Sequence, residues 1–134
     1  MAGLSPKLPL HRDFEDGYAL NKTFEDTARQ NLKMLILTSP GERIMFPSFG
    51  VGLRRYLFRN ANASTFSEIK SNVRSQVRRY LPYIKIKSVN FISESDTAEA
   101  VRTLESSSPD NFVYMQIRYS IPSFFLSDTL SIKL

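Results

Sequence analysis

The segment from Pro40 to Leu53 constrains this chain more strongly than any other stretch. It reads PGERIMFPSFGVGL, so proline and glycine recur between two helical patterns. Proline fixes the backbone φ angle and glycine permits conformations that other residues avoid, so these positions predict tight turns. The segment carries no metal-ligand cluster, and Gly50-Val51-Gly52 is too short for a phosphate-binding loop. It therefore indicates an architectural role rather than catalysis.

The composition fits one domain without disulfides. The chain has 134 residues, 42% of them apolar, which is near the common size for a single core. It contains no cysteine, which excludes disulfide and thiolate chemistry. No apolar run approaches the roughly 20 residues of a membrane span, and Met1 to His11 lacks an apolar signal core. We therefore expect a soluble chain with no membrane partner that is not exported by the general route.

Positive charge is concentrated in one part of the chain. Between Gly52 and Lys87 there are nine basic residues and one acid, Glu68, so this segment has a net charge of +8. Because the whole chain carries +5, the remainder carries −3. Such asymmetry is typical of a surface that meets an acidic partner, either protein or nucleic acid. The nine basic residues are Arg54, Arg55, Arg59, Lys70, Arg74, Arg78, Arg79, Lys85 and Lys87.

A first amphipathic pattern predicts a helix that Asn21 or Thr23 can cap. It should stop at 38–41, because Pro40 disfavours helical geometry in the residue before it. Beyond this point we expect a short strand from Arg43 to Phe46 and a short helix from Leu53 to Phe58. The positions expected to face the core are Phe24, Ala28, Leu32, Leu35 and Ile36 in the first helix, and Leu53, Tyr56 and Leu57 in the short one.

A second amphipathic pattern predicts the longest helix, which Ser64 should cap and Pro82 should end. The carboxylate of Glu68 lies near its positive end. A basic stripe runs parallel to the apolar one, about 100° around the helix. The apolar stripe consists of Ile69, Val73, Val77, Tyr80 and Leu81, and the basic stripe of Lys70, Arg74 and Arg78.

Alternating apolar residues predict strands in the last third of the chain. The pattern from Ile84 to Phe91 changes phase at Lys87-Ser88, which indicates a bulge. Two further strands are expected over 112–120 and 124–134, separated by Pro122, and the polar stretch from Thr97 to Asp110 predicts a long hairpin loop. The residues expected to be buried are Val113, Met115, Ile117 and Tyr119 in the middle strand, and Leu126, Leu130 and Ile132 in the last.

These patterns predict an α+β fold, with N-terminal helices packed on a small, mostly antiparallel C-terminal sheet. Residues 1–22 carry prolines and little pattern, so we expect an extended arm that becomes ordered against a partner. Residues 23–134 are expected to form a single α+β domain.

Gly41-Glu42-Arg43, followed by Pro47-Ser48-Phe49-Gly50 and Leu53, resembles the motif of the baseplate wedge and sheath-initiator family of contractile tails. This family includes phage baseplate proteins and their type VI secretion counterparts, and the resemblance runs from about Thr27 to Ile121. It implies that the segment is structural and buries Phe49 against the helices. The structural residues carried over from the motif are Gly41, Arg43, Pro47, Phe49, Gly50, Leu53 and Pro82.

The resemblance implies a non-enzymatic wedge subunit of a phage tail baseplate, assembled in the host cytoplasm and present in about six copies per ring. Its implied partners are the tail sheath protein and other wedge and hub proteins. Sheath subunits of relatives add strands to the initiator's sheet, and an edge strand presents unpaired backbone groups for such pairing. The candidate residues for sheath binding are Phe124, Phe125, Leu126, Leu130, Ile132 and Leu134.

The basic residues form a second candidate partner surface, which would dock on the baseplate. A solvated helix face explains the same pattern equally well. We do not expect direct nucleic-acid binding, because Phe66, Tyr80 and Tyr83 look better placed for packing than for base stacking. The candidate residues of this surface are Arg54, Arg55, Lys70, Arg74 and Arg78.

The sequence offers little for catalysis, and we expect neither enzymatic activity nor a cofactor. His11 is the only histidine and lies in the arm, so a zinc site would lack converging ligands. Relatives have been called lysozyme-like, but no acid here lies in the apolar sequence that a glycosidase general acid needs. The acids considered are Asp13, Glu15, Asp16, Glu25, Asp26, Glu94, Asp96 and Glu99.

One departure from the family motif affects the expected contacts. After the long helix the family shows Glu-Pro-Arg-Ile, whereas this chain has Leu81-Pro82-Tyr83-Ile84. The helix stop should persist, but the contact made by the charged pair is lost. Three alternatives remain open: a type VI secretion sheath initiator, a small interaction module like a bacterial anti-adaptor of the same fold class, and a cell-wall hydrolase.

Overall fold

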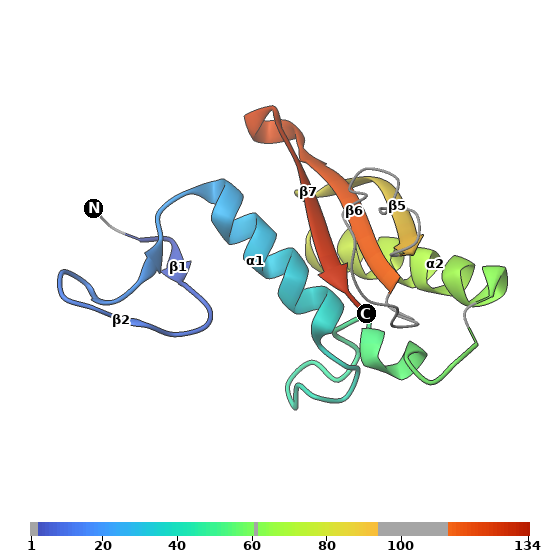
Figure 1. Cartoon of the computed structure of the whole chain (residues 1–134). Helices are drawn as coiled ribbons and strands as arrows, with labels where there is room; N and C mark the ends of the chain where they lie inside the picture. Colours follow the sequence, from blue (N-terminus) through green and yellow to red (C-terminus); the bar gives the residue numbers. More distant parts are fainter. Residues whose placement is uncertain (1–2, 61, 94–112) are drawn as a thin grey trace, which may run out of the picture.

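A computed structural model describes residues 3–60, 62–93 and 113–134. Helices α1 (Phe24–Leu37) and α2 (Ala63–Tyr80) pack on a three-stranded antiparallel sheet of order β5-β6-β7. The strands are β5 (Lys85–Ser93), β6 (Val113–Ile121) and β7 (Leu126–Lys133) (Figure 1). Buried residues of both helices and of the inner sheet face form one core cluster. The α+β prediction is therefore confirmed.

Residues 3–22 fold back on themselves instead of running as one extended arm. Strands β1 (Ser5–Pro6) and β4 (Leu20–Asn21) pair antiparallel, as do β2 (Arg12–Asp13) and β3 (Gly17–Tyr18). This N-terminal unit projects beyond α1, away from the sheet (Figure 1). The sequence pattern missed these pairs because each strand has only two residues. The domain boundary after residue 22 stays a prediction.

Helix α1 begins and ends where its sequence signals place it. The Thr23 side chain accepts a hydrogen bond from the Asp26 amide, so Thr23 is the cap, and the helix ends at Leu37 before Pro40. Four of the five predicted core positions are buried, and Phe24 is the exception. Its ring stacks on Phe124, with centroids 4.6 Å apart. No helix in the described ranges is both long and apolar enough to cross a membrane.

The segment after α1 has less regular structure than predicted. Ile44 and Met45 form a bend and no strand covers residues 43–46, so the predicted strand from Arg43 to Phe46 is wrong. The short helix is a 3₁₀ turn, η1 (Leu53–Tyr56), which buries Leu53 but leaves Leu57 exposed. Turn formers dominate this stretch, and the backbone bonds to α1 instead of to a strand.

Helix α2 is capped by Asn62, two residues before the predicted Ser64. The Asn62 Oδ1 atom accepts hydrogen bonds from the Thr65 amide at 2.9 Å and the Thr65 hydroxyl at 2.8 Å. Ile69, Val73 and Val77 are buried as predicted. Asparagine and serine cap equally well, so composition alone did not choose between them.

The sheet confirms the predicted bulge and shifts the start of the last strand. The β5–β6 register slips between Ile86 and Ser88, which leaves Lys87 as the extra residue. On β6, Met115, Ile117 and Tyr119 are buried. Phe124 and Phe125 lie in a turn around η2 (Pro122–Phe124), so strand β7 starts only at Leu126. The loop predicted from Thr97 to Asp110 and the side chain of Val113 fall outside the described residues.

Candidate functional site: the sheet edges and the basic groove

The loop after α1 is locked to that helix through its backbone. The Val51 amide donates to the Leu35 carbonyl at 3.0 Å, and the Gly52 amide donates to the Thr38 carbonyl at 2.9 Å. Gly50 has φ of 110°, and a Cβ there would lie directly on the carbonyl oxygen of Thr38. Only glycine fits both the angle and this approach.

The same loop is also fastened to α2. The Phe49 ring packs edge-on against Tyr80 at 4.9 Å, and the Arg43 guanidinium lies 3.9 Å above the Phe49 ring centre. Gln76 accepts from the Gly50 amide at 3.1 Å and donates to the Ser48 carbonyl at 3.2 Å. The motif residues thus join the two helices, which is an architectural role.

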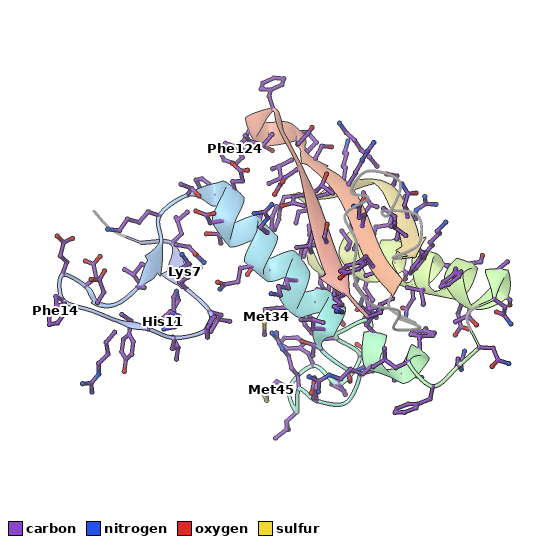
Figure 2. All side chains as sticks on the ribbon, viewed as in Figure 1. Lys7, His11, Phe14, Met34, Met45 and Phe124 are labelled. Atoms are coloured by element: carbon purple, nitrogen blue, oxygen red, sulfur yellow. The ribbon has the colours of Figure 1, made fainter. Side chains whose placement is uncertain are left out.

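An apolar tip projects from this loop, and the sequence pattern missed it. Ile44, Met45 and Phe46 are 94%, 85% and 60% exposed, and Met45 lies at the outer end of the loop (Figure 2). Three large apolar residues in a row also fit a strand, which is why the sequence pattern predicts one here. Their position between Gly41 and Pro47, whose backbones bond at 2.8 Å, is the signal that would have indicated an exposed turn.

Among the described residues no strand pairs with the outer edge of β7, and side chains cap the backbone of this edge at Thr129. The Thr129 amide donates to Asp128 Oδ1 at 2.7 Å, and its carbonyl accepts from Arg29 Nη2 at 3.4 Å. Both groups of Thr129 therefore point away from β6. Because orientation alternates along an antiparallel strand, the backbone of Ser127 and Ser131 has the same outward direction.

A groove of about 570 Å³ runs beside this edge, between β7, α1 and the N-terminal unit. Lys7 and Asn21 come from the N-terminal unit, Arg29 from α1, and Thr129 and Ser131 from β7. Elements from three parts of the chain therefore meet at one sheet edge, a juxtaposition that the sequence pattern does not reveal.

The residues predicted for sheath binding divide between core and surface. Leu130 and Ile132 are buried, and Leu126 and Leu134 pack partly against the core. Phe124 stacks on Phe24, at the turn labelled in Figure 2. Phe125 is 97% exposed with φ of 52°, a left-handed conformation that is unusual for a bulky residue. The apolar side chains of β7 thus pack against the core and hold the strand in place.

Strand β5 forms the other edge, and the basic stripe of α2 lies along it. A groove of about 960 Å³ between the end of α2 and the start of β5 is lined by Arg74, Arg78, Arg79 and Lys85. Lys70 lies one turn earlier, with its amine 5.8 Å from the Phe91 ring centre on β5. We refer to this site as the basic groove.

The structure separates the five basic residues that were grouped from the sequence. Lys70, Arg74 and Arg78 face β5. Arg54 and Arg55 lie on η1, which packs beside the opposite flank of α2, where Asn72 donates to the Val51 carbonyl. Residues 72 and 74 differ by about 200° around a helix, so they cannot share a face.

Reactive groups are sparse in the described part of the chain. No cluster of three or more potential metal ligands occurs there, and His11 lies on the N-terminal unit (Figure 2). Burial raises the pKa of Tyr119 well above its usual value, aided by the hydrogen bond to Asp128 Oδ2 at 3.0 Å. That hydroxyl supports the Arg29–Asp128 contact and is enclosed in the core.

The turn after α2 brings Tyr83 against α1. Helix α2 ends at Tyr80, and the Ile84 amide then donates to the Leu81 carbonyl at 3.0 Å. Asn31 of α1 donates to the Tyr83 hydroxyl at 3.2 Å. The helix stop at Pro82 is confirmed, and Tyr83 bridges the two helices.

Known proteins resemble this chain both in fold and in sequence family. Two solved structures have the same fold, each with a TM-score of 0.65 and 22% identity. A candidate tail lysozyme from Geobacter sulfurreducens matches 87% of this chain and 94% of its own. A chain of the six-fold symmetrised anti-feeding prophage baseplate matches 85% of this chain and 81% of its own length. No curated protein sequence shows significant similarity.

The model of the Baseplate wedge protein gp25 family matches residues 22–123, well over half of the chain. This range contains both helices, the locked loop and strands β5 and β6. The chain therefore belongs to the Baseplate wedge protein gp25 family and is a baseplate component of a contractile injection system.

Proposed function

We propose that this protein is a wedge subunit of a contractile phage tail and that its β7 edge templates the first sheath ring by strand addition. The observation that carries the proposal is the outward backbone of Thr129, together with the regular β6–β7 register over eight pairs. A regular edge with a groove beside it offers main-chain hydrogen bonds to an incoming strand. Breaking such a junction requires many bonds to open together, which suits a contact that must survive contraction.

The rest of the molecule has a scaffold role in this proposal. The N-terminal unit and the basic residues dock on wedge and hub proteins, and about six copies form a ring, in keeping with the symmetry of the prophage baseplate. Assembly takes place in the host cytoplasm before the particle is complete. The protein acts without catalysis: Asp16, Glu68 and Asp128 all form ion pairs with basic residues, a structural use of carboxylates.

A test of templating must leave the core intact. Deleting residues 124–134 would remove the buried Leu130 and Ile132, so loss of sheath binding in that variant would only report unfolding. Ser131→Pro is sharper, because proline removes one outward amide and is tolerated on an edge whose N–H faces away from the sheet. Ser131→Ala keeps the amide and is the matched control.

We would co-purify each variant with the sheath protein of the same genome and image the product by negative stain. Wild type and Ser131→Ala should seed sheath-like rings, and Ser131→Pro should seed few or none while keeping its circular dichroism spectrum. Normal rings on the folded proline variant would contradict strand addition at β7. Turbidity measurements on purified peptidoglycan test the non-enzymatic role, and clearing by the protein would overturn it.

A further inference from the structure

We propose that the basic groove binds an extended acidic segment of a partner protein, with carboxylates at alternating positions. This inference deepens the proposed docking of the basic face and rests on it, but it does not depend on sheath templating. The groove lies beside β5, whereas the templating edge is β7, and β6 separates the two. The two proposals can therefore fail independently.

The positive charges of the basic groove are not balanced by acidic residues in its lining. Its lining includes four cations and no acid. The ion pairs in the described residues involve Lys22, Arg29 and Arg59, so Arg74, Arg78 and Lys85 have none there. Converging cations without a counter-ion repel one another, and an acidic ligand would relieve that repulsion.

The floor of the groove favours a polypeptide as the ligand. Pro82 and Ile86 provide apolar surface between the charged side chains, whereas Val77 and Ile84 line the groove but are almost fully buried. Nucleic acid would gain from rings that stack on bases, but the lining contains no aromatic residue. The rings nearby are already packed, Tyr80 on Phe49 and Phe91 (beside Lys70) on Phe66. Charge with an apolar floor and no stacking ring is better suited to an acidic peptide.

The spacing of the cations favours an extended ligand. Lys70, Arg74 and Arg78 follow one another at four-residue intervals, which is about 6 Å along a helix axis. In an extended chain, side chains two residues apart lie on one side, separated by about 6.6 Å. A segment with Asp or Glu at every second position therefore places successive carboxylates opposite successive cations.

The bulge on β5 makes side chains, and not the strand backbone, the main recognition element. The extra residue Lys87 interrupts the regular β5 ladder, and its amine turns to Ser127 Oγ at 3.1 Å. Bulges at sheet edges limit pairing with another chain. We therefore expect recognition through charge and apolar contact over about four to six ligand residues.

The test uses the full-length protein and a fluorescein-labelled synthetic ten-residue peptide in which Asp alternates with Val. Binding is followed by fluorescence anisotropy at 50 mM and 300 mM NaCl. The groove variant combines Arg74→Glu, Arg78→Glu and Lys85→Glu. The control variant carries the same charge change elsewhere, through Arg54→Glu, Arg55→Glu and Arg118→Glu, and circular dichroism confirms that both variants are folded.

We expect the groove variant to bind the alternating peptide at least tenfold more weakly, since each exposed pair contributes about two- to fivefold. The control variant should lose less than threefold, and a peptide with the same residues in an acidic block should bind several-fold more weakly than the alternating one. Equal losses in the two variants would overturn the proposal, as would equal binding of both peptides. Tighter binding of a 20-nucleotide DNA than of the peptide would also overturn it. Sheath seeding by the groove variant separates this result from the proposed function, because that activity should persist.

Discussion

Arg29 on α1 and Asp128 on β7 form a two-point ion pair between residues 99 positions apart. Arg29 Nε lies 3.0 Å from Asp128 Oδ2, and Arg29 Nη2 lies 3.1 Å from Asp128 Oδ1. The same two side chains cap the outward carbonyl and amide of Thr129. They occupy backbone groups that an added strand would need, so the pair caps this sheet edge at Thr129.

Replacing Arg29 with alanine should therefore uncover the β7 edge. We expect a loss of about 1 kcal/mol in the free energy of unfolding, because the arginine is half exposed, together with concentration-dependent self-association. Urea denaturation and light scattering measure the two effects. Arg118→Ala removes an exposed arginine of β6 that has no ion pair in the described residues, and should change neither quantity. A monomeric Arg29→Ala at high concentration would contradict the protective role.

Tyr119→Phe should show a pH-dependent effect. At neutral pH it removes the hydrogen bond to Asp128 and should cost about 1 kcal/mol. In the unfolded chain the tyrosine loses its proton near its usual pKa of 10.0, whereas the folded chain retains it because its pKa is raised. Wild-type stability should thus fall as pH rises above about 10, while phenylalanine has no proton to lose.

The difference in the free energy of unfolding between wild type and Tyr119→Phe should consequently narrow between pH 9 and pH 11. Urea denaturation at each pH measures this difference. The other ionisable groups are common to both proteins, so their titration largely cancels. A difference that stays constant over this range would show that Tyr119 titrates alike in both states.

Gly50→Ala should be among the most damaging single changes. Its Cβ would lie on the Thr38 carbonyl in a left-handed conformation, so we expect a loss of more than about 3 kcal/mol. Gly41→Ala is the matched control, since Gly41 has φ of 92° but open space around it, and should cost about 1–2 kcal/mol. Thermal unfolding of both variants tests whether Gly50→Ala loses more stability than Gly41→Ala. Equal losses would mean that the backbone conformation, and not the close approach to Thr38, accounts for the effect at Gly50.

Asn62→Ala tests the observed start of α2. Loss of its cap on the Thr65 amide should cost about 1 kcal/mol. Ser64→Ala, at the cap position predicted from the sequence, should change the free energy of unfolding by less than about 0.5 kcal/mol. The reverse order in urea denaturation would place the helix start at Ser64.

Gln30→Ala should release the N-terminal unit. The Gln30 side chain accepts from the Leu8 amide at 3.0 Å and the Asn21 side chain at 3.0 Å, and donates to the Pro6 carbonyl at 2.9 Å. Its loss should speed proteolysis within residues 3–22 several-fold and leave the rest protected. Lys33→Ala, a neighbouring exposed position on α1, is the control, and equal cleavage of the two variants would exclude Gln30 as the tether.

Local patterns succeeded where a single element decides the outcome. The buried stripes of α1 and α2 and the helix stop before Pro82 follow from spacing and residue type, whereas the cap of α1 was narrowed only to Asn21 or Thr23. The bulge at Lys87 was visible because a phase change in alternation has one simple structural cause. The apolar tip and the η2 turn were missed because a short apolar run also fits a strand.

The sequence by itself determined the α+β class, the core faces and the turn-rich loop, because hydrophobic periodicity and backbone restrictions act over a few residues. Tertiary structure alone decided which strands lie at the sheet edges, where Arg29 meets Asp128 and which cations share a groove. Lys70, Arg74 and Arg78 share one flank of α2 by helical geometry, but only packing brings β5 and Lys85 to that flank and places Arg54 and Arg55 on the other. Such contacts join residues far apart in the chain, and no local pattern encodes them.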